Sequence, residues 1–308
     1  MHRSKCYCLF LMMLSFAALS FAPAFAVKID AELDVYGGYR WDKISTTIHA
    51  YSPPGRLILE DILTAKNVRL WTVGVAGKQL FYQCLLVKGS AEWGRVCGGD
   101  YINYGVVPDV PTSKTTADIH SGNTQDFSLG GGIMLPVFCN ELNLGVLGGW
   151  SFNSQRIKMR NAQTNGISSP ILNNLTYKTT WEGPWVGVEG ALSYCSYYLN
   201  LGYEYHFARW RASWQLDGPD IFGGAYSDKR WSNGNHGQVF FMNTSYPLLH
   251  CLEVGLAFKY QYWKAGNGRE KPKGGSFAAV GLPGNEIDKI PNASWQSYGL
   301  NLVLEYSF

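Results

Sequence analysis

Four cysteines recur at nearly equal spacing in this sequence, and their thiols are its most reactive side chains. They are Cys84, Cys139, Cys195 and Cys251. Such thiols form disulfides in an oxidising compartment. Because Cys97 makes the count odd within 27–308, at least one thiol is left for another molecule. The pattern predicts bonding to another protein; the alternative is that these cysteines are small apolar residues packed in turns.

Charged side chains on the polar face of alternating segments form a second set of candidate functional residues. The set comprises Asp34, Arg40, Lys88, Glu92, Glu189, Glu204, His206, Glu253, Lys259 and Glu305. Acidic residues outnumber basic ones, so a pore lined by this face would favour cations. The alternative is a crosslinked polar network that fills the space. A barrel of eight strands has room only for side chains and one of sixteen is open, so both alternatives stand.

Signals for other chemistry are weak. The cysteines and histidines lack the spacing of zinc ligands. The glycine-rich stretches "LGGGIML" and "VLGGW" lie within strand-like segments and precede no helix, which argues against phosphate binding. A formal net charge of +3, without a basic stripe, argues against a nucleic-acid partner. We therefore expect no cofactor and no metal.

The elements that must position these residues are strands. In "YYLNLGYEYHF" and "LEVGLAFKYQY" apolar and polar residues alternate with period two, as in a strand with one apolar face. Ten such segments predict a transmembrane antiparallel β-barrel of ten strands. Their expected ranges are 29–42, 67–78, 80–94, 124–135, 141–153, 178–192, 196–214, 231–246, 251–264 and 294–308.

The connections between these segments alternate between short and long. Short turns are expected at 77–79, "PVFCN", "SYC" and "YPLLHC", so the evenly spaced cysteines fall at the turns. Neighbouring turns would lie on the order of 10 Å apart, whereas a disulfide needs Cα atoms within about 7 Å. Long extracellular loops are expected at 43–66, 95–123, 154–177, 215–230 and 265–293. Within the first loop, 57–63 is expected to fold inward or form a short helix. A plug formed by this stretch would favour a structural role over a pore.

Aromatic residues mark the expected membrane boundaries. All eleven tryptophans are expected near the outer strand ends, with tyrosine and phenylalanine at the periplasmic ends. The chain finishes on an alternating segment whose last lipid-facing residues are Tyr306 and Phe308. This ending resembles the signal by which the outer-membrane insertion machinery recognises its substrates.

The segment 1–26 predicts export. A basic start is followed by an apolar run and by Ala24-Phe25-Ala26, which is typical of a cleaved signal peptide. We expect residues 27–308 to form one barrel domain in the bacterial outer membrane, with the lipid bilayer as a partner. No later run approaches the roughly 20 apolar residues of a membrane helix. The alternative for the first segment is a membrane anchor.

The whole chain after the signal peptide resembles the Protochlamydia outer membrane protein family. The resemblance rests on "AELDVYGGYRWDKI", "YKTTWEGPWVGVEGALSYC" and "YYLNLGYEYHFARW". It implies porin-like diffusion of small hydrophilic solutes or ions. The alternative function is a disulfide-crosslinked structural or adhesive envelope protein with a plugged lumen.

The ten-strand architecture also resembles the omptins, which are outer-membrane proteases. That family needs an Asp-x-Asp pair on the third strand and an Asp-x-His pair above the seventh. Here Asp100 fits one position, but Gly98 occupies the other. Asp217 and Asp220 have no histidine beside them, and His206 and His236 lie several residues away. We therefore expect no enzymatic activity.

Overall fold

The computed structural model describes residues 29–52, 56–106, 112–138, 141–168, 175–194, 197–216, 227–273 and 289–308. Its elements are all strands, and in these ranges no helix is long and apolar enough to cross a membrane. The signal peptide expected at 1–26 lies outside them. The described strands are β1 (Ile29–Ser52), β2 (Arg56–Phe81), β3 (Leu85–Val106), β4 (Ser113–Phe138), β5 (Leu142–Thr164), β6 (Ile167–Ser168), β7 (Leu175–Tyr194), β8 (Tyr197–Leu216), β9 (Ser227–Leu249), β10 (Leu252–Ala265), β11 (Gly268–Lys273) and β12 (Lys289–Ser307).

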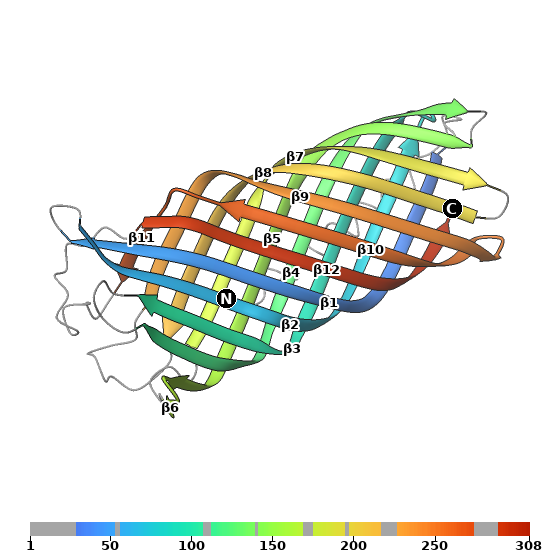
Figure 1. Ribbon diagram of the computed structural model, residues 1–308. Helices are drawn as coiled ribbons and strands as arrows, with labels where there is room; N and C mark the ends of the chain where they lie inside the picture. The colour runs from blue at the N-terminus through green and yellow to red at the C-terminus, as the bar shows by residue number, and fades with distance from the viewer. Residues whose placement is uncertain are drawn as a thin grey trace.

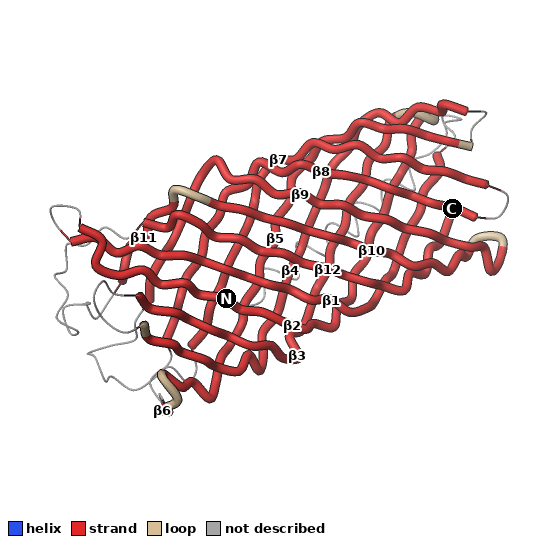
Figure 2. Tube along the Cα trace, viewed as in Figure 1, coloured by secondary structure: helices blue, strands red, loops and turns tan. Residues whose placement is uncertain are grey.

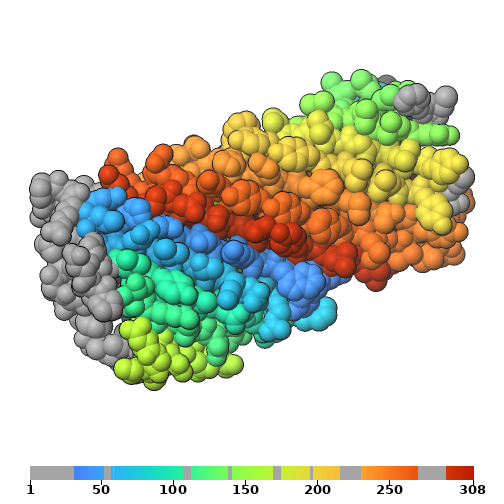
Figure 3. Space-filling view, in the orientation of Figure 1, coloured from blue at the N-terminus to red at the C-terminus, as the bar shows by residue number. Residues whose placement is uncertain are grey.

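Ten long strands close into one antiparallel barrel, as the alternating segments predict. Each pairs with its neighbours in chain order, and β1 pairs with β12 to complete the ring. Figure 1 shows these strands crossing the molecule at a steep tilt, and Figure 3 shows the red strip of β12 beside the blue β1. The short strands β6 and β11 only extend the wall at one end, where β11 pairs with β9 and β12.

The strands are much longer than the alternation of lipid-facing residues indicates. A tilted membrane strand needs about 9–11 residues. In contrast, β1 has 24 residues and β2 has 26 residues. Strand continues through most of 43–66, 95–123 and 154–177, which are expected as loops, so the structure is almost entirely strand (Figure 2). The expected inward fold or helix at 57–63 is wrong, because this stretch belongs to β2 and pairs with β1 and β3.

The polarity of the two faces reverses partway along most of the long strands. On β1, Val35 and Trp41 are exposed on the outside while Arg40 and Asp42 are buried inside. Farther along, Ile44 and Ile48 are buried inside. An apolar outside suits lipid, and an apolar inside suits a wall surrounded by water. We call the part of the barrel on the loop side of Trp41, Trp71, Trp93 and Trp150 the outer extension, because the long-loop end of such barrels faces outward.

The first short turn lies farther along the chain than expected. It is formed by Tyr82, Gln83 and Cys84, with the Cys84 amide donating to the Phe81 carbonyl at 3.1 Å. Tyr82 and Gln83 both have positive φ, which is what the two central positions of a tight hairpin turn require. The expected turn residue Gly77 instead pairs with Gly89 inside the ladder.

The tryptophans divide between two environments, so their expected common position at one outer rim is wrong. Trp41, Trp71, Trp150 and Trp231 are exposed on the outer wall. Six others are buried in the interior: Trp181, Trp185, Trp210, Trp214, Trp263 and Trp295. The opposite rim does carry exposed Tyr194, Tyr197, Tyr246, Tyr306 and Phe308, as expected of an interfacial belt.

Candidate functional site

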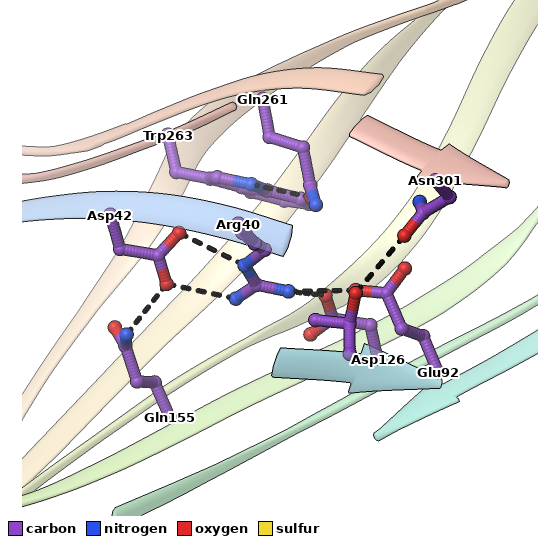
Figure 4. A network of polar contacts seen from close by, with 9 residues as sticks. Arg40, Asp42, Glu92, Asp126, Gln155, Gln261, Trp263 and Asn301 are labelled. Atoms are coloured by element: carbon purple, nitrogen blue, oxygen red, sulfur yellow. Dashed lines mark hydrogen bonds and ion pairs between the residues drawn. The ribbon is translucent and has the colours of Figure 1, made fainter. Parts of the chain in front are cut away.

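The candidate functional site is the barrel interior, and its centre is the guanidinium of Arg40. This side chain is only 2% exposed. It binds Asp42 through two hydrogen bonds, Nε to Oδ1 at 2.9 Å and Nη2 to Oδ2 at 3.0 Å. Its Nη1 atom donates to Glu92 of β3 at 3.0 Å and to Asp126 of β4 at 2.6 Å. One cation therefore holds three carboxylates from three strands together (Figure 4).

The Arg40 network continues across the lumen. Gln155 of β5 donates from Nε2 to Asp42 Oδ2 at 2.6 Å, which joins two strands far apart in the ring. Nearby, Thr72 donates to Asn301 at 3.1 Å, and Trp263 donates to Gln261 at 3.3 Å (Figure 4). Buried charges are stable only when they are paired and hydrogen-bonded, and the contacts with Asp42, Glu92 and Asp126 satisfy that requirement for Arg40.

A second cross-lumen group is built on Lys88 of β3. Its ammonium group lies 2.8 Å from Glu189 on β7 and 3.1 Å from Glu204 on β8. The same group lies 5.3 Å from the centre of the Trp185 ring and 4.5 Å from that of Phe241. Two carboxylates and two aromatic faces therefore surround this ammonium group.

Ser151, His206 and Glu204 are connected in the order of a catalytic triad. The Ser151 hydroxyl lies 2.9 Å from His206 Nδ1, and His206 Nε2 lies 3.2 Å from Glu204. A nucleophile must, however, reach its substrate. Ser151 is 3% exposed, and His206 is packed between Trp185 and Trp263. This chain of contacts is therefore part of the interior packing.

A third polar group lies toward the short-turn end. Lys78 of β2 binds Glu32 and donates to the Tyr198 hydroxyl of β8 at 2.8 Å. The expected lumen residues Asp34, Glu253 and Lys259 are partly buried at interior positions, and Glu305 is buried there. Ser245 donates to Glu253. All ten residues expected in the lumen thus lie on the inner face.

Aromatic and aliphatic side chains occupy the interior of the outer extension. Trp263 stacks on Trp295 with ring centres 6.1 Å apart and lies 5.8 Å from Trp181 of β7. Tyr101 of β3 meets Trp214 of β8 at 6.0 Å. The apolar cluster also includes Ile44, Leu63, Ile157 and Met159, among others. The interior is therefore polar at membrane level and largely apolar beyond it.

The residues that would match the omptin motif do not come together in the described part of the chain. Asp100 is exposed on the outer wall and accepts a hydrogen bond from Asn67 at 3.0 Å. His206 lies in the membrane-level interior, and His236 stacks on Tyr205. Asp217 and Asp220 lie outside the described residues. In the described ranges no group of three or more His, Cys, Asp or Glu side chains is placed to hold a metal.

The cysteines in the described ranges carry free thiols. Cys84 and Cys251 are partly buried at two short turns, and Cys97 is exposed on β3. Cys139 and Cys195 lie outside the described residues. At the last strand Tyr306 and Phe308 pack edge to face with ring centres 4.7 Å apart, and both are exposed to the outside.

Several interior residues lie outside the set expected from the sequence. Asp42 follows Arg40 by two positions and therefore shares its face, so the period-two rule was sufficient to find it. Asp126 and Lys78 also lie on inner faces of their strands. Gln155 was missed for a different reason, because its segment was expected to be a loop.

A solved structure with a similar fold is that of an outer-membrane barrel. OmpT, an outer membrane protease of Escherichia coli, has a TM-score of 0.71 at 13% identity, covering 94% of this chain and 100% of that one. The translocator domain of the autotransporter NalP from Neisseria meningitidis is less similar, with a TM-score of 0.33, 10% identity and coverage of 99% and 98%. The likeness to OmpT is one of fold alone. Comparison with curated proteins gives no match.

The model of the Protochlamydia outer membrane protein family matches residues 34–308. This range contains every long strand of the barrel except the first residues of β1. The match agrees with the closed antiparallel ring, the lipid-facing belt and the bacterial outer membrane as location. The chain belongs to the Protochlamydia outer membrane protein family.

Proposed function

We propose that this protein is a structural component of the outer membrane whose lumen is closed by its own side chains. The observation that carries the proposal is a series of direct contacts across the ring. Lys78 reaches Tyr198, Lys88 reaches Glu189 and Asp42 accepts from Gln155. Farther out, Thr46 of β1 lies 3.3 Å from the Tyr177 hydroxyl of β7.

The closure follows from the size of the barrel and of its inward side chains. The diameter of a barrel grows roughly in proportion to its strand number, so a ring of ten strands is only about a quarter wider than one of eight, which side chains alone can fill. Arginine, lysine and tryptophan are long enough to meet side chains that project from other parts of such a ring, as Lys78 meets Tyr198 and Lys88 meets Glu189. An ion that entered would have to replace the carboxylates bound to Arg40, and breaking a buried ion pair costs about 3–5 kcal/mol.

Porin-like passage of small hydrophilic solutes or ions is the second candidate. The excess of acidic residues at membrane level favours it, since a lumen of this charge would admit cations. It requires the Lys88 and Arg40 contacts to open transiently. Closed and conducting barrels differ in a directly measurable quantity, the ionic current.

The experiment is planar-bilayer recording of the refolded protein and two double variants. The first, K78A/K88A, removes two cross-lumen lysines. The second, K43Q/K264Q, changes two exposed lysines on the outer wall and serves as the matched control. We expect no steps from wild type or control, and steps from K78A/K88A. Folding is checked by the shift in gel mobility on heating.

Steady, salt-dependent steps from wild type would overturn the closed-barrel proposal. A change of those steps in E204Q or K259Q would assign the current to this lumen and establish the porin. Silence from wild type together with current from K78A/K88A would establish that the side chains close an otherwise passable ring.

We further infer that the barrel acts without catalysis. The outward position of Asp100 and the burial of Ser151 support this inference. Incubation of folded protein with a fluorogenic peptide library tests it, and cleavage that persists after repurification would contradict it. The free thiols at Cys84 and Cys251 support crosslinking to other cysteine-bearing envelope proteins as the structural role.

A further inference from the structure

The outer wall formed by β3, β4, β5 and β7 carries several basic side chains just beyond its apolar belt. On β5 the outward side chains run from Val146 and Trp150 to Phe152, and then to Arg156 and Lys158. On β3 the outward Trp93 is followed two residues later by Arg95. Outward residues on a strand repeat every second position, so these cations lie directly beyond the lipid-facing belt.

The cations on these strands are neighbours because of the strand register. Arg95 pairs with Asn123, Asn123 pairs with Arg156, and Arg156 pairs with Lys178 of β7. Lys158 follows Arg156 on the same face. We call Arg95, Arg156, Lys158 and Lys178 the cationic cluster.

The charges of the cationic cluster are not balanced by the protein in the described ranges. None of its four members forms an ion pair there, and Arg95, Arg156 and Lys178 are exposed. The carboxylates on the same outward faces have other partners, since Glu182 pairs with Arg211 at 2.8 Å and Asp118 accepts from Asn161 at 2.8 Å. Like charges directly opposite each other, such as Arg156 and Lys178, are destabilising unless an anion lies between them.

An aromatic platform lies immediately on the membrane side of the cationic cluster. Trp93, Phe127 and Phe152 come from three adjacent strands and face outward. The rings of Trp93 and Phe127 meet edge to face at 5.7 Å, and Phe127 lies 6.2 Å from Phe152. Aromatic rings of this kind are typical of the boundary between acyl chains and headgroups. The cationic cluster is therefore at the depth of the outer-leaflet headgroups.

We propose that the cationic cluster and the aromatic platform together bind a lipid of the outer leaflet whose headgroup carries more than one phosphate. Arginine and lysine are the side chains that bind phosphate oxygens, and the platform contacts the adjoining sugar or acyl segment. From β3 to β7 the cluster spans three strand spacings, about 14 Å. That width exceeds a single phosphate and suits a headgroup with two separated phosphates. The site lies on the outer wall and does not depend on whether the lumen conducts.

The test compares binding of diphosphoryl and monophosphoryl lipid A to the folded full barrel in detergent, measured by native mass spectrometry. The variant is R156Q/K178Q, and the control is K43Q/K264Q, whose changes lie on the opposite side of the ring at exposed positions. Because two cations at a charged lipid surface are lost, we expect the variant to bind diphosphoryl lipid about 30-fold more weakly. Wild type and control should bind it alike, and the monophosphoryl form more weakly.

Three results would overturn the proposal. The first is equal affinity of R156Q/K178Q and K43Q/K264Q for diphosphoryl lipid A. The second is no preference of wild type for two phosphates over one. The third is complete displacement of the lipid by millimolar pyrophosphate, which would identify free phosphate as the ligand. Should R156Q/K178Q fail to fold, the single variants R156Q and K178Q replace it, each with an expected loss of about fivefold.

Discussion

Gln155 and Asp42 face each other across the barrel, and the Nε2 atom of the glutamine donates to the carboxylate at 2.6 Å. The two residues belong to β5 and β1, which are separated by three strands along the ring. Asp42 is held at the same time by Arg40. The Gln155–Asp42 contact therefore links β5 to the ion-pair network of Arg40.

Replacing Gln155 by leucine should destabilise the folded barrel by about 1–3 kcal/mol, because a buried carboxylate loses a hydrogen-bond donor. Thermal unfolding in detergent, followed by circular dichroism, measures the change. Q125L is the matched control, since Gln125 lies on the neighbouring strand at an outward position. Equal midpoints for the two variants would show that the bridge contributes nothing.

Replacing Arg40 by methionine should cost more, about 3–5 kcal/mol, because Asp42, Glu92 and Asp126 lose their common cation while they remain buried. Thermal unfolding of the variant in detergent measures the loss. A midpoint equal to that of wild type would contradict this role for Arg40.

The apolar interior of the outer extension predicts a strong effect at Trp263, which is 0% exposed. Truncation to alanine should cost about 3–5 kcal/mol, as expected for a buried tryptophan. W71A provides the comparison, since Trp71 is 63% exposed on the outer wall. A larger loss from W71A than from W263A would place the stabilising packing outside the barrel.

The three described cysteines should differ in accessibility from the cell exterior. Cys97 is exposed in the outer extension, whereas Cys84 and Cys251 lie at the short turns. In single-cysteine variants a membrane-impermeant maleimide should label Cys97 on intact cells. It should label Cys84 and Cys251 only after the outer membrane is permeabilised. Labelling of Cys84 on intact cells would reverse the assigned orientation.

Replacing Phe308 at the end of the last strand should impair assembly into the outer membrane in cells but not refolding in detergent. Phe308 is 72% exposed, and its backbone amide donates to Ala31 at 2.9 Å. F308S keeps that amide, so it should refold in detergent as wild type does. In cells F308S should accumulate less in the outer membrane, because the insertion machinery is expected to recognise the aromatic side chain of Phe308. Y306F is the control, and equal membrane levels for F308S and Y306F would contradict the role of the signal.

The sequence determined the barrel because the membrane imposes a strict alternation. A strand with lipid on one side and polar groups on the other must alternate apolar and polar residues with period two. Residues 297–308 show this alternation, and β12 follows it to its last residue. The same rule placed Arg40, Glu92, Glu189 and Glu204 on the inner face. Membership in the family was likewise accessible from whole-chain resemblance.

The outer extension is not recognisable from the sequence, because its inward residues are apolar and its outward residues are polar, which reverses the lipid-facing pattern. Ile44 and Ile48 point inward where a lipid-facing pattern would place polar residues, so the alternation does not identify these segments as membrane strands. The strand register, which brings residues distant in sequence together, depends on the closed ring. Only that tertiary closure decided that Lys88 meets Glu189, that Asp42 meets Gln155, and that Trp263 of β10 packs beside Trp181 of β7.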